Sequence, residues 1–268
     1  MTRWLLRTLT ELSSRRSVSR LAGLAANSRL SRRLIPAFVA LYRIDTAEAE
    51  LPPEQYPTLN AFFTRRLKPG ARPVDPDPAA LVSPVDGRLV AAGPVADGTV
   101  IEVKGQSYSL SELLNGSPRV PIYAGGHYWV LYLSPSDYHR IHAPCDGEIA
   151  EQERIPGRAY PVNEFGLGLG RRVLSRNERL VTYIRHEKGE VAVVKVGAMN
   201  VSSIRCEEPL PSRLTKGEEF ARFEFGSTVV LLAEGGLCEP RGDLKPGDRI
   251  RVGERLATII GTSDFSVT

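Results

Sequence analysis

The chain has 268 residues, a formal net charge of +4, and 42% apolar against 25% charged residues. This length suits one large domain, or one domain with an appendage, around an ordinary soluble core. No apolar run reaches the ~18–20 residues of a membrane-spanning helix, and we expect no secretory signal at the start. The three cysteines, Cys145, Cys206 and Cys238, form no CxxC pair, which argues against a disulfide framework and a structural zinc site.

Positive charge is concentrated at the start of the chain. Residues 1–43 hold nine arginines and one acid, Glu11, so this segment carries +8 and the remaining residues carry −4. The basic character therefore belongs to an arm, while the body is mildly acidic. A body that binds nucleic acid is not expected.

The arm has helical apolar spacing. Residues 3–25 predict an amphipathic helix, and a second stripe runs through residues 30–41, where Pro36 predicts a kink or a restarted helix. Aromatic and apolar residues among arginines suit the interface of an anionic membrane. We interpret residues 1–50 as a basic, membrane-associating helical arm. A solvated arm packed on the body and an organelle presequence are the alternatives.

The rest of the chain, residues 51–268, predicts one catalytic domain. Residues 59–67 predict a short helix capped by Thr58. From residue 81 short apolar runs alternate with turn signals, and the strongest buried strands are 128–133, 191–196 and 229–233. Residues 246–254 predict a hairpin. The fold class expected is α+β: a β-rich domain with few helices and an N-terminal helical arm.

A Gly-Ser pair, Gly226-Ser227, enters the last of these strands. Glycine weakens a strand because it has no side chain to pack. It also leaves its carbonyl open, and the Ser227 hydroxyl can reach that carbonyl if a base takes its proton. A turn or bulge that feeds a buried strand is the alternative.

Two histidines and an aspartate are candidates for that base and its support. His139 and His142 follow the strand 128–133, and residues three apart share one side of a helical turn. They could act as bases, or as zinc ligands with His127 or Asp86 as a third ligand. Asp86 lies in a Pro-Val-Asp-Gly turn and could orient a histidine in an Asp–His–Ser227 relay.

Beyond these residues, the chain resembles the phosphatidylserine decarboxylase proenzymes of bacteria and mitochondria. The tyrosine–histidine block at 133–144 followed by FGST at 225–228 is the most specific part of the match. Phe225 stands where the family usually has Leu, and the glycine-rich residues 165–170 are unusual. The matching segments are 62–73 (FFTRRLKPGARP), 84–87 (PVDG), 104–110 (KGQSYSL), 133–144 (LSPSDYHRIHAP), 156–157 (PG), 177–179 (NER), 196–198 (VGA) and 225–228.

The resemblance implies that the chain makes its own cofactor. Ser227 would attack the Gly226 carbonyl, and the chain would separate into a β chain (1–226) and an α chain (227–268) capped by a pyruvoyl group. That group would form a Schiff base with the amine of phosphatidylserine, release CO₂ and yield phosphatidylethanolamine, with no metal. Asp86 and His142 match the relay that activates Ser227, and His139 matches a residue implicated in proton transfer near the pyruvoyl.

The implied partners are phosphatidylserine in an anionic membrane and the two cleaved chains themselves, as a heterodimer that could pair into a homodimer. The implied location is peripheral, on the cytoplasmic face of the cell membrane, or on the mitochondrial inner membrane. Two other classes of protein stay open. One is a non-catalytic carrier module of the lipoyl or phosphocarrier sort, for which no convincing exposed hairpin lysine is present. The other is a zinc hydrolase that uses His139 and His142.

Overall fold

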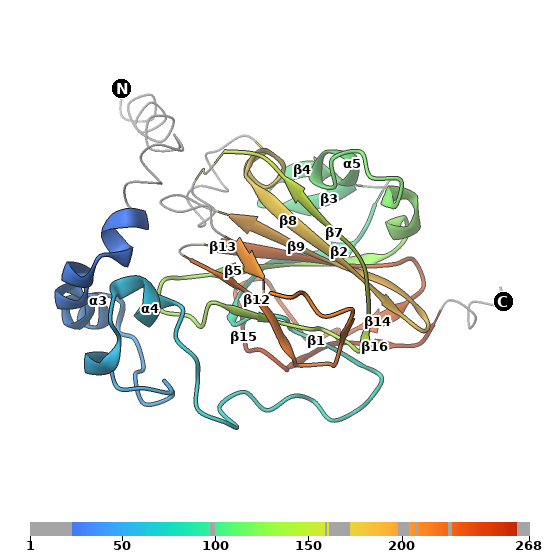
Figure 1. Cartoon of the computed structure of the whole chain (residues 1–268). Helices are drawn as coiled ribbons and strands as arrows, with labels where there is room; N and C mark the ends of the chain where they lie inside the picture. Colours follow the sequence, from blue (N-terminus) through green and yellow to red (C-terminus); the bar gives the residue numbers. More distant parts are fainter. Residues whose placement is uncertain are drawn as a thin grey trace.

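The computed structural model describes residues 23–96, 100–158, 160, 172–197, 204–206, 208–224 and 227–261. The helices are short and the strands dominate (Figure 1). The helical elements are η1 (Arg29–Leu34), α3 (Ile35–Tyr42), η2 (Pro53–Gln55), α4 (Leu59–Phe63), α5 (Leu110–Leu113), η3 (Val120–Tyr123) and α7 (Val173–Arg176). The expectation of a β-rich domain with few helices is confirmed.

The strands form one large sheet and three smaller ones. The large sheet has the order β11-β7-β8-β9-β13-β5-β2-β15, beside the small sheets β10-β12-β6, β1-β16-β14 and β3-β4. The strands are β1 (Ala80–Val82), β2 (Gly87–Pro94), β3 (Val100–Val103), β4 (Gln106–Ser109), β5 (His127–Leu133), β6 (Arg140–His142), β7 (Gly147–Ile155), β8 (Arg179–His186), β9 (Gly189–Gly197), β10 (Ile204–Cys206), β11 (Arg213–Leu214), β12 (Glu219–Phe223), β13 (Ser227–Ala233), β14 (Cys238–Pro240), β15 (Arg249–Ile250) and β16 (Arg255–Ile259).

The three strongest predicted strands lie together at the centre of the large sheet. β13 pairs antiparallel with β5 on one side and β9 on the other, each over seven residue pairs. Every residue of β13 is buried. A strand covered on both faces is apolar without alternation, which is why its sequence reads as a continuous β-branched and leucine run.

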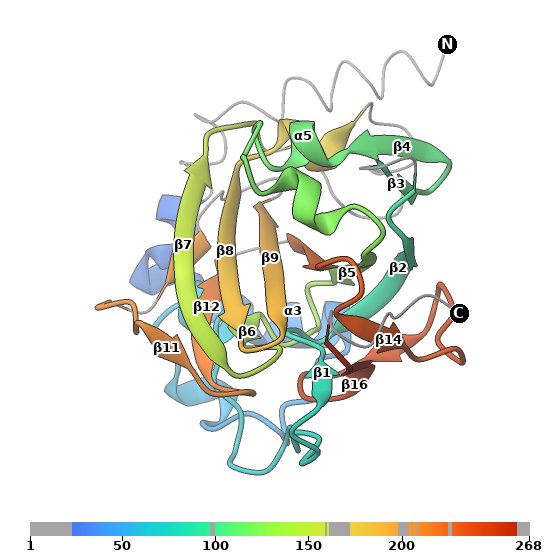
Figure 2. The same cartoon turned by 90° about the vertical axis from the view of Figure 1, so that its right-hand side faces the viewer.

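Each face of the large sheet has its own core. One core, which includes Val194, Val196 and Val230, packs against α5, η3 and the β3–β4 hairpin. The other includes Val193, Val229 and Phe223 and packs against the two small three-stranded sheets. Figure 2 shows α5 and β3–β4 at one end of the large strands and the small sheets at the other. Because side chains alternate along β13, neighbouring residues of this strand point into different cores.

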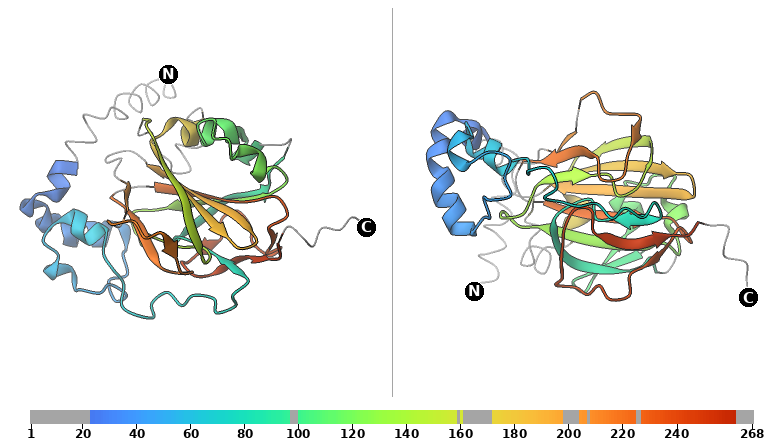
Figure 3. Two further views of the ribbon diagram at one scale, coloured as in Figure 1. Left: turned by 45° about the vertical axis from the view of Figure 1, so that its right-hand side comes forward. Right: turned by 90° about the horizontal axis from the view of Figure 1, so that it is seen from below.

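The helices of the N-terminal part lie at one end of the β body (Figures 1 and 3). The predicted helix over 3–25 lies almost entirely outside the described residues, of which 23–27 are helical. The restart at Pro36 is confirmed, because η1 ends at Leu34 and Pro36 lies in the first turn of α3. A small core joins Ile35, Ile44 and Phe62 across the predicted boundary at residue 50. That boundary stays a prediction.

Two local predictions were wrong. The helix expected over 59–67 ends at Phe63, although Thr58 does cap it by accepting a hydrogen bond from the Ala61 amide at 3.0 Å. The stretch 246–254 is not a hairpin. Its strand β15 pairs with β2, and the next strand, β16, pairs with β1 and β14. Turn-rich sequence marks where a chain bends, but the partner of each short strand depends on the tertiary packing.

Lys195 is a fully buried cation beneath β12. Its Nζ donates to Thr182 Oγ1 at 2.5 Å and lies 4.9 Å from the centre of the Phe220 ring. The described residues supply no carboxylate within ion-pair distance of it. Burial lowers the pKa of Lys195 to about 7, against 10.5 for the free side chain. Between pH 7 and 10.5 the unfolded state binds more protons than the folded state. The contribution of Lys195 to the free energy of unfolding therefore rises with pH over this range.

We therefore expect Lys195→Met to stabilise the protein at neutral pH. Removing an unpaired buried cation while keeping its volume should raise the free energy of unfolding at pH 7 by about 2 kcal/mol. The gain should shrink towards pH 10, where the native lysine is neutral. Urea unfolding at several pH values measures both effects. Lys188→Met, at an exposed lysine, is the matched control and should change neither. A Lys195→Met protein less stable than wild type at pH 7 contradicts this account.

Candidate active site

Ser227 is the first residue of β13, with its backbone paired to Leu133 of β5 and Gly197 of β9. Its side chain points into the same core as Val229, because the two are two residues apart on one strand. Ser227 is fully buried, and its Oγ has no hydrogen-bond partner among the described residues. A buried hydroxyl without a partner is uncommon and needs an explanation. Gly226 and Phe225, the other half of the predicted cleavage site, lie outside the described residues.

Two chain segments pass from the large sheet to the small β12–β6 sheet beside Ser227. One leaves β5 after Leu133 and enters β6, and the other joins β12 to β13. Near the β6 and β12 ends of these segments, the Phe223 amide donates to the His139 carbonyl at 2.9 Å. Leu133 pairs with Ser227, and His139 follows Leu133 by six residues. His139 also lies opposite Phe223, which precedes Ser227 by four residues. This topology brings the histidine block towards Ser227, although 84 residues of sequence lie between His142 and Ser227.

His139 is a buried neutral imidazole. Its Nδ1 lies 2.9 Å from the Asp137 carbonyl oxygen, which can only accept, so Nδ1 carries the proton. The lone pair is then on Nε2, which is buried and has no partner in the described part of the chain. The Phe63 ring covers the imidazole at a centroid distance of 4.0 Å. Burial lowers the pKa of His139 to about 3, so the ring is uncharged at neutral pH.

His142 is held at both nitrogens. Its Nδ1 donates to the Gly217 carbonyl at 2.7 Å, and its Nε2 accepts from the Tyr138 hydroxyl at 3.1 Å. Gly217 has a φ of +83°, a conformation that favours glycine. Burial lowers the pKa of His142, although the Gly217 hydrogen bond and the charges of Glu219 and Asp86 oppose this. The two histidines do not share a helical turn, because His142 ends the strand β6 and His139 precedes it.

Asp86 carries an ion pair with Arg72. Arg72 Nε donates to both carboxylate oxygens at 2.9 Å, and the Val252 amide donates to Oδ1 at 2.9 Å. Burial lowers the pKa of Arg72, but its hydrogen bonds to Asp86 and Glu48 outweigh this and the net shift is upward. The described hydrogen bonds do not join Asp86 to His142, or either histidine to Ser227. The charge of Asp86 raises the pKa of His142, as one of the smaller influences on it.

α4 and the residues after it cover this region. Phe63 packs on His139, and the Thr64 carbonyl accepts from Arg140 Nε at 2.8 Å. Arg65 is only 4% exposed and reaches the turn before His139, where its Nη2 donates to the Ser136 carbonyl at 2.9 Å. Arg65, Tyr138 and Arg72 were not singled out from the sequence. All three lie in or beside the segments that carry the family resemblance, which was the only signal that could have found them.

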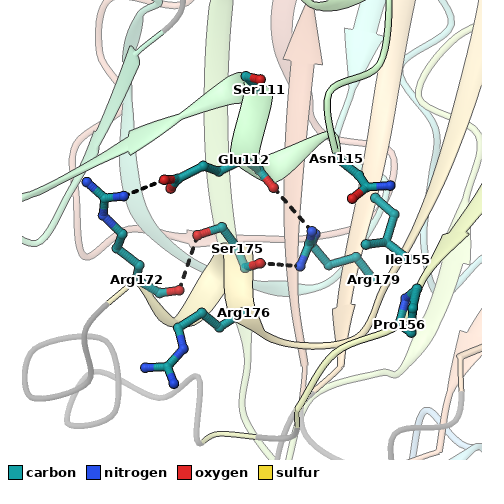
Figure 4. Close-up of a pocket in the computed structure, with 9 residues that line it drawn as sticks. All are labelled: Ser111, Glu112, Asn115, Ile155, Pro156, Arg172, Ser175, Arg176 and Arg179. Carbon is teal, nitrogen blue, oxygen red and sulfur yellow. Dashed lines mark hydrogen bonds and ion pairs between the residues drawn. The ribbon is translucent and has the colours of Figure 1, made fainter.

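The end of β9 beside Ser227 is braced from the other face of the sheet. Asn177 is fully buried and donates to the Gly197 carbonyl at 2.8 Å. Near it lies a pocket of about 460 Å³ (Figure 4), lined by Ser111, Glu112, Asn115, Ile155, Pro156, Arg172, Ser175, Arg176 and Arg179.

The buried cation of this pocket is already satisfied. Arg179 donates to the carbonyls of Leu113 at 2.9 Å and Ser175 at 2.5 Å, and Arg172 pairs with Glu112. Burial lowers the pKa of Arg179 to about 10. We therefore interpret Arg179 as a structural residue whose hydrogen bonds link β8 to α5 and α7.

The described residues contain no group of three or more His, Cys, Asp or Glu side chains placed to hold a metal ion. His127 and Asp86, the suggested third ligands, do not join His139 and His142 in such a group. The carrier alternative rested partly on the hairpin at 246–254, which is not formed. An exposed lysine does lie at a hairpin tip, contrary to expectation, because Lys188 stands between β8 and β9.

Known proteins with similar sequences belong to a family whose activity fits this site. The sequence profile described as phosphatidylserine decarboxylase matches residues 59–258. The chain is 44% identical over 260 residues to phosphatidylserine decarboxylase proenzymes of Bacillus thuringiensis subsp. konkukian (strain 97-27), Bacillus cereus (strain AH187) and Bacillus mycoides (strain KBAB4). Each match covers 96% of this chain and 98% of the relative.

A buried serine at a strand start, with neutral histidines nearby, fits an enzyme that processes itself before it acts. The profile match and these relatives define the class as a decarboxylase made as a proenzyme. The chain belongs to the phosphatidylserine decarboxylase family.

Proposed function

We propose that this chain cuts itself between Gly226 and Ser227 and then converts phosphatidylserine to phosphatidylethanolamine and CO₂. The observation that carries the proposal is the unpartnered, fully buried Ser227 Oγ at the start of β13. A hydroxyl that makes no hydrogen bond in the folded chain is available for reaction, and the family membership supplies the reaction class.

Self-cleavage needs no external reagent except water. The Ser227 hydroxyl gives its proton to a histidine while Oγ bonds to the Gly226 carbonyl carbon. The Gly226–Ser227 C–N bond then breaks, the proton passes to the freed amine, and an ester remains. Loss of the Ser227 α-proton expels the Gly226 carboxylate and leaves dehydroalanine, and water converts this to a pyruvoyl group and ammonia.

The histidines divide the proton transfers in this proposal. Asp86 and His142 support the attack of Ser227, with Asp86 acting through its charge on His142, and His139 moves protons during decarboxylation. The support for His139 is its uncharged ring with a free, buried Nε2. The support for His142 is its fixed orientation between Gly217 and the Tyr138 hydroxyl.

A pyruvoyl group at position 227 would supply an electron sink for the electrons left when CO₂ departs. The residues present fit such a group, because position 227 is fully buried with an unpartnered oxygen among the described residues, at the start of a strand whose core on this face includes Phe223. Because position 227 has no exposed surface, a proton at the reacting carbon would come from the protein.

The two cleaved chains would stay together as a heterodimer. β13 would become the first strand of the α chain, yet it is hydrogen-bonded along its whole length between β5 and β9 of the β chain. β16 likewise pairs with β1. Cutting the backbone before Ser227 removes none of these pairings.

Intact mass spectrometry under denaturing conditions tests the proposal. Two chains, residues 1–226 and 227–268, are expected, the smaller with an N-terminal pyruvoyl in place of serine. Purified protein should then release CO₂ from phosphatidylserine vesicles. A single chain of 29.4 kDa that persists on long incubation with lipid contradicts self-processing.

We also propose that the N-terminal helices hold the enzyme peripherally on the cytoplasmic face of an anionic membrane. No described helix is long and apolar enough to cross a bilayer. Four leucines are instead strongly exposed on residues 23–43, at 56–74%: Leu24, Leu30, Leu34 and Leu41. Arginines alternate with them at positions 29, 32, 33 and 43. Apolar side chains beside basic ones match a headgroup layer that carries negative charge.

Replacing Leu30 and Leu41 together with Gln should weaken vesicle binding by at least about tenfold, because each buried leucine contributes roughly 1.5–3 kcal/mol. Flotation with phosphatidylserine vesicles measures this. Ile122→Gln is the control, since Ile122 is 36% exposed on η3, away from the helical end. Equal flotation of wild type and the double variant counts against the helices as the membrane contact.

A further inference from the structure

Arg65 is a buried cation with unused hydrogen-bond donors. It is 4% exposed, and only its Nη2 is bonded, to the carbonyls of Ser136 at 2.9 Å and Asp137 at 3.5 Å. Its Nε and Nη1 are buried and have no acceptor in the described structure. The guanidinium carbon lies 5.3 Å from the centre of the Phe62 ring. Two donor nitrogens of one charged group therefore lack an acceptor among the described residues.

Such an arrangement is unfavourable unless something else uses it. Burying a charge without an ion-pair partner costs several kcal/mol, and each unmade hydrogen bond adds to that cost. The desolvation is visible in the lowered pKa of Arg65, to which burial contributes most. The neighbouring Arg72, in contrast, is fully matched by Asp86 and Glu48. An acceptor that arrives with a ligand would satisfy these donors, and an anionic acceptor would also balance the charge of Arg65.

Arg65 lies beside His139. The Asp137 carbonyl oxygen accepts from both Arg65 Nη2 and His139 Nδ1, so one oxygen atom separates the guanidinium from the imidazole. The Tyr56 ring lies 5.4 Å from the Phe62 ring that Arg65 covers. An anion bound to Arg65 would therefore lie no farther from His139 than the length of a small lipid headgroup.

We propose that Arg65 binds the phosphodiester of the lipid substrate through a guanidinium nitrogen that no described residue uses, Nε on one edge of the group or Nη1 on the other. A hydrogen bond from a guanidinium to a phosphate oxygen is charge-assisted and therefore stronger than one between neutral groups. The headgroup has a second anion, its carboxylate, but an arginine there would stabilise the charge that must be lost as CO₂ and would slow the reaction. A phosphodiester keeps its charge throughout. Binding it anchors the headgroup and leaves the carboxylate for the apolar surroundings of His139. This inference rests on the proposed function.

The test uses matured enzyme and two soluble substrates. Arg65→Gln is compared with Arg66→Gln, whose arginine is exposed and whose one ion pair among the described residues is with Glu219 at 3.9 Å. For short-chain phosphatidylserine below its micelle concentration, Arg65→Gln should raise KM about 10- to 100-fold, the range of a lost charge-assisted pair. The rate on a phosphate-free O-alkyl serine should change less than about threefold. Arg66→Gln should match wild type on both.

Direct binding separates this inference from the proposed function. Diethyl phosphate, a small phosphodiester, should bind wild type with a saturable NMR shift that Arg65→Gln lacks, whether or not either protein turns over. Lack of saturable binding to wild type overturns the inference, even if no Arg65 variant matures. Equal losses by Arg65→Gln on both substrates, or an unchanged KM, also overturn it. If wild type binds diethyl phosphate but decarboxylates neither substrate, the proposed function fails and the anion site stands.

Discussion

Ser227→Ala is expected to leave the chain whole, at 29.4 kDa, and to abolish decarboxylation. Alanine has no oxygen to attack the Gly226 carbonyl, and no later step can then form a pyruvoyl group. The fold should survive unchanged. The Ser227 Oγ has no described hydrogen-bond partner, so its removal leaves no other polar group unsatisfied. We expect a free energy of unfolding equal to that of the uncleaved wild type or up to about 1 kcal/mol higher.

The neighbouring Thr228 provides a matched control. It is also fully buried in β13 with an unpartnered hydroxyl in the described structure, but alternation along the strand points it into the opposite core, away from His139. Thr228→Val should cleave at the wild-type rate. Intact mass and urea unfolding decide both cases. Cleavage of Ser227→Ala at the same bond would show that Ser227 is not the nucleophile.

The second large effect is a separation of maturation from turnover. His142→Ala should remain a single chain, because the relay that supports Ser227 is lost. His139→Ala should cleave but decarboxylate about 10²- to 10⁴-fold more slowly, the usual contribution of a positioned acid or base. Intact mass reports cleavage, and CO₂ release from phosphatidylserine reports turnover. Tyr138→Phe, which removes the hydroxyl bonded to His142 Nε2, should slow cleavage without abolishing turnover of matured enzyme.

His186→Ala is the control for these histidine variants, because His186 ends β8 at the β8–β9 hairpin and should affect neither measurement. An uncleaved His139→Ala protein would reassign the first proton transfer to His139, whose Nε2 is unoccupied in the described structure. Cleavage of His142→Ala at the wild-type rate would remove His142 from maturation. Either result would change which histidine is assigned to which proton transfer, and the family assignment would stay the same.

Local sequence determined the elements whose signal lies within a few residues. The β-branched run after Ser227 could only be a buried strand, and β5 and β9 were predicted in the same way. Thr58 capped its helix, and Pro36 restarted one, because both effects are carried by the residue itself. The histidine block and the Gly-Ser pair, in that order along the chain, also identified the family.

Tertiary structure alone decided which side chains meet and which are left without partners. The sequence could not pair β15 with β2, because a two-residue strand has little preference of its own. It suggested Asp86 as the partner of a histidine, yet the Asp86 carboxylate accepts hydrogen bonds from Arg72 and the Val252 amide. It gave no sign that Arg65 is buried beside His139 with two unused donors. Burial and hydrogen-bond satisfaction depend on what distant segments bring together, and the substrate site is made of those juxtapositions.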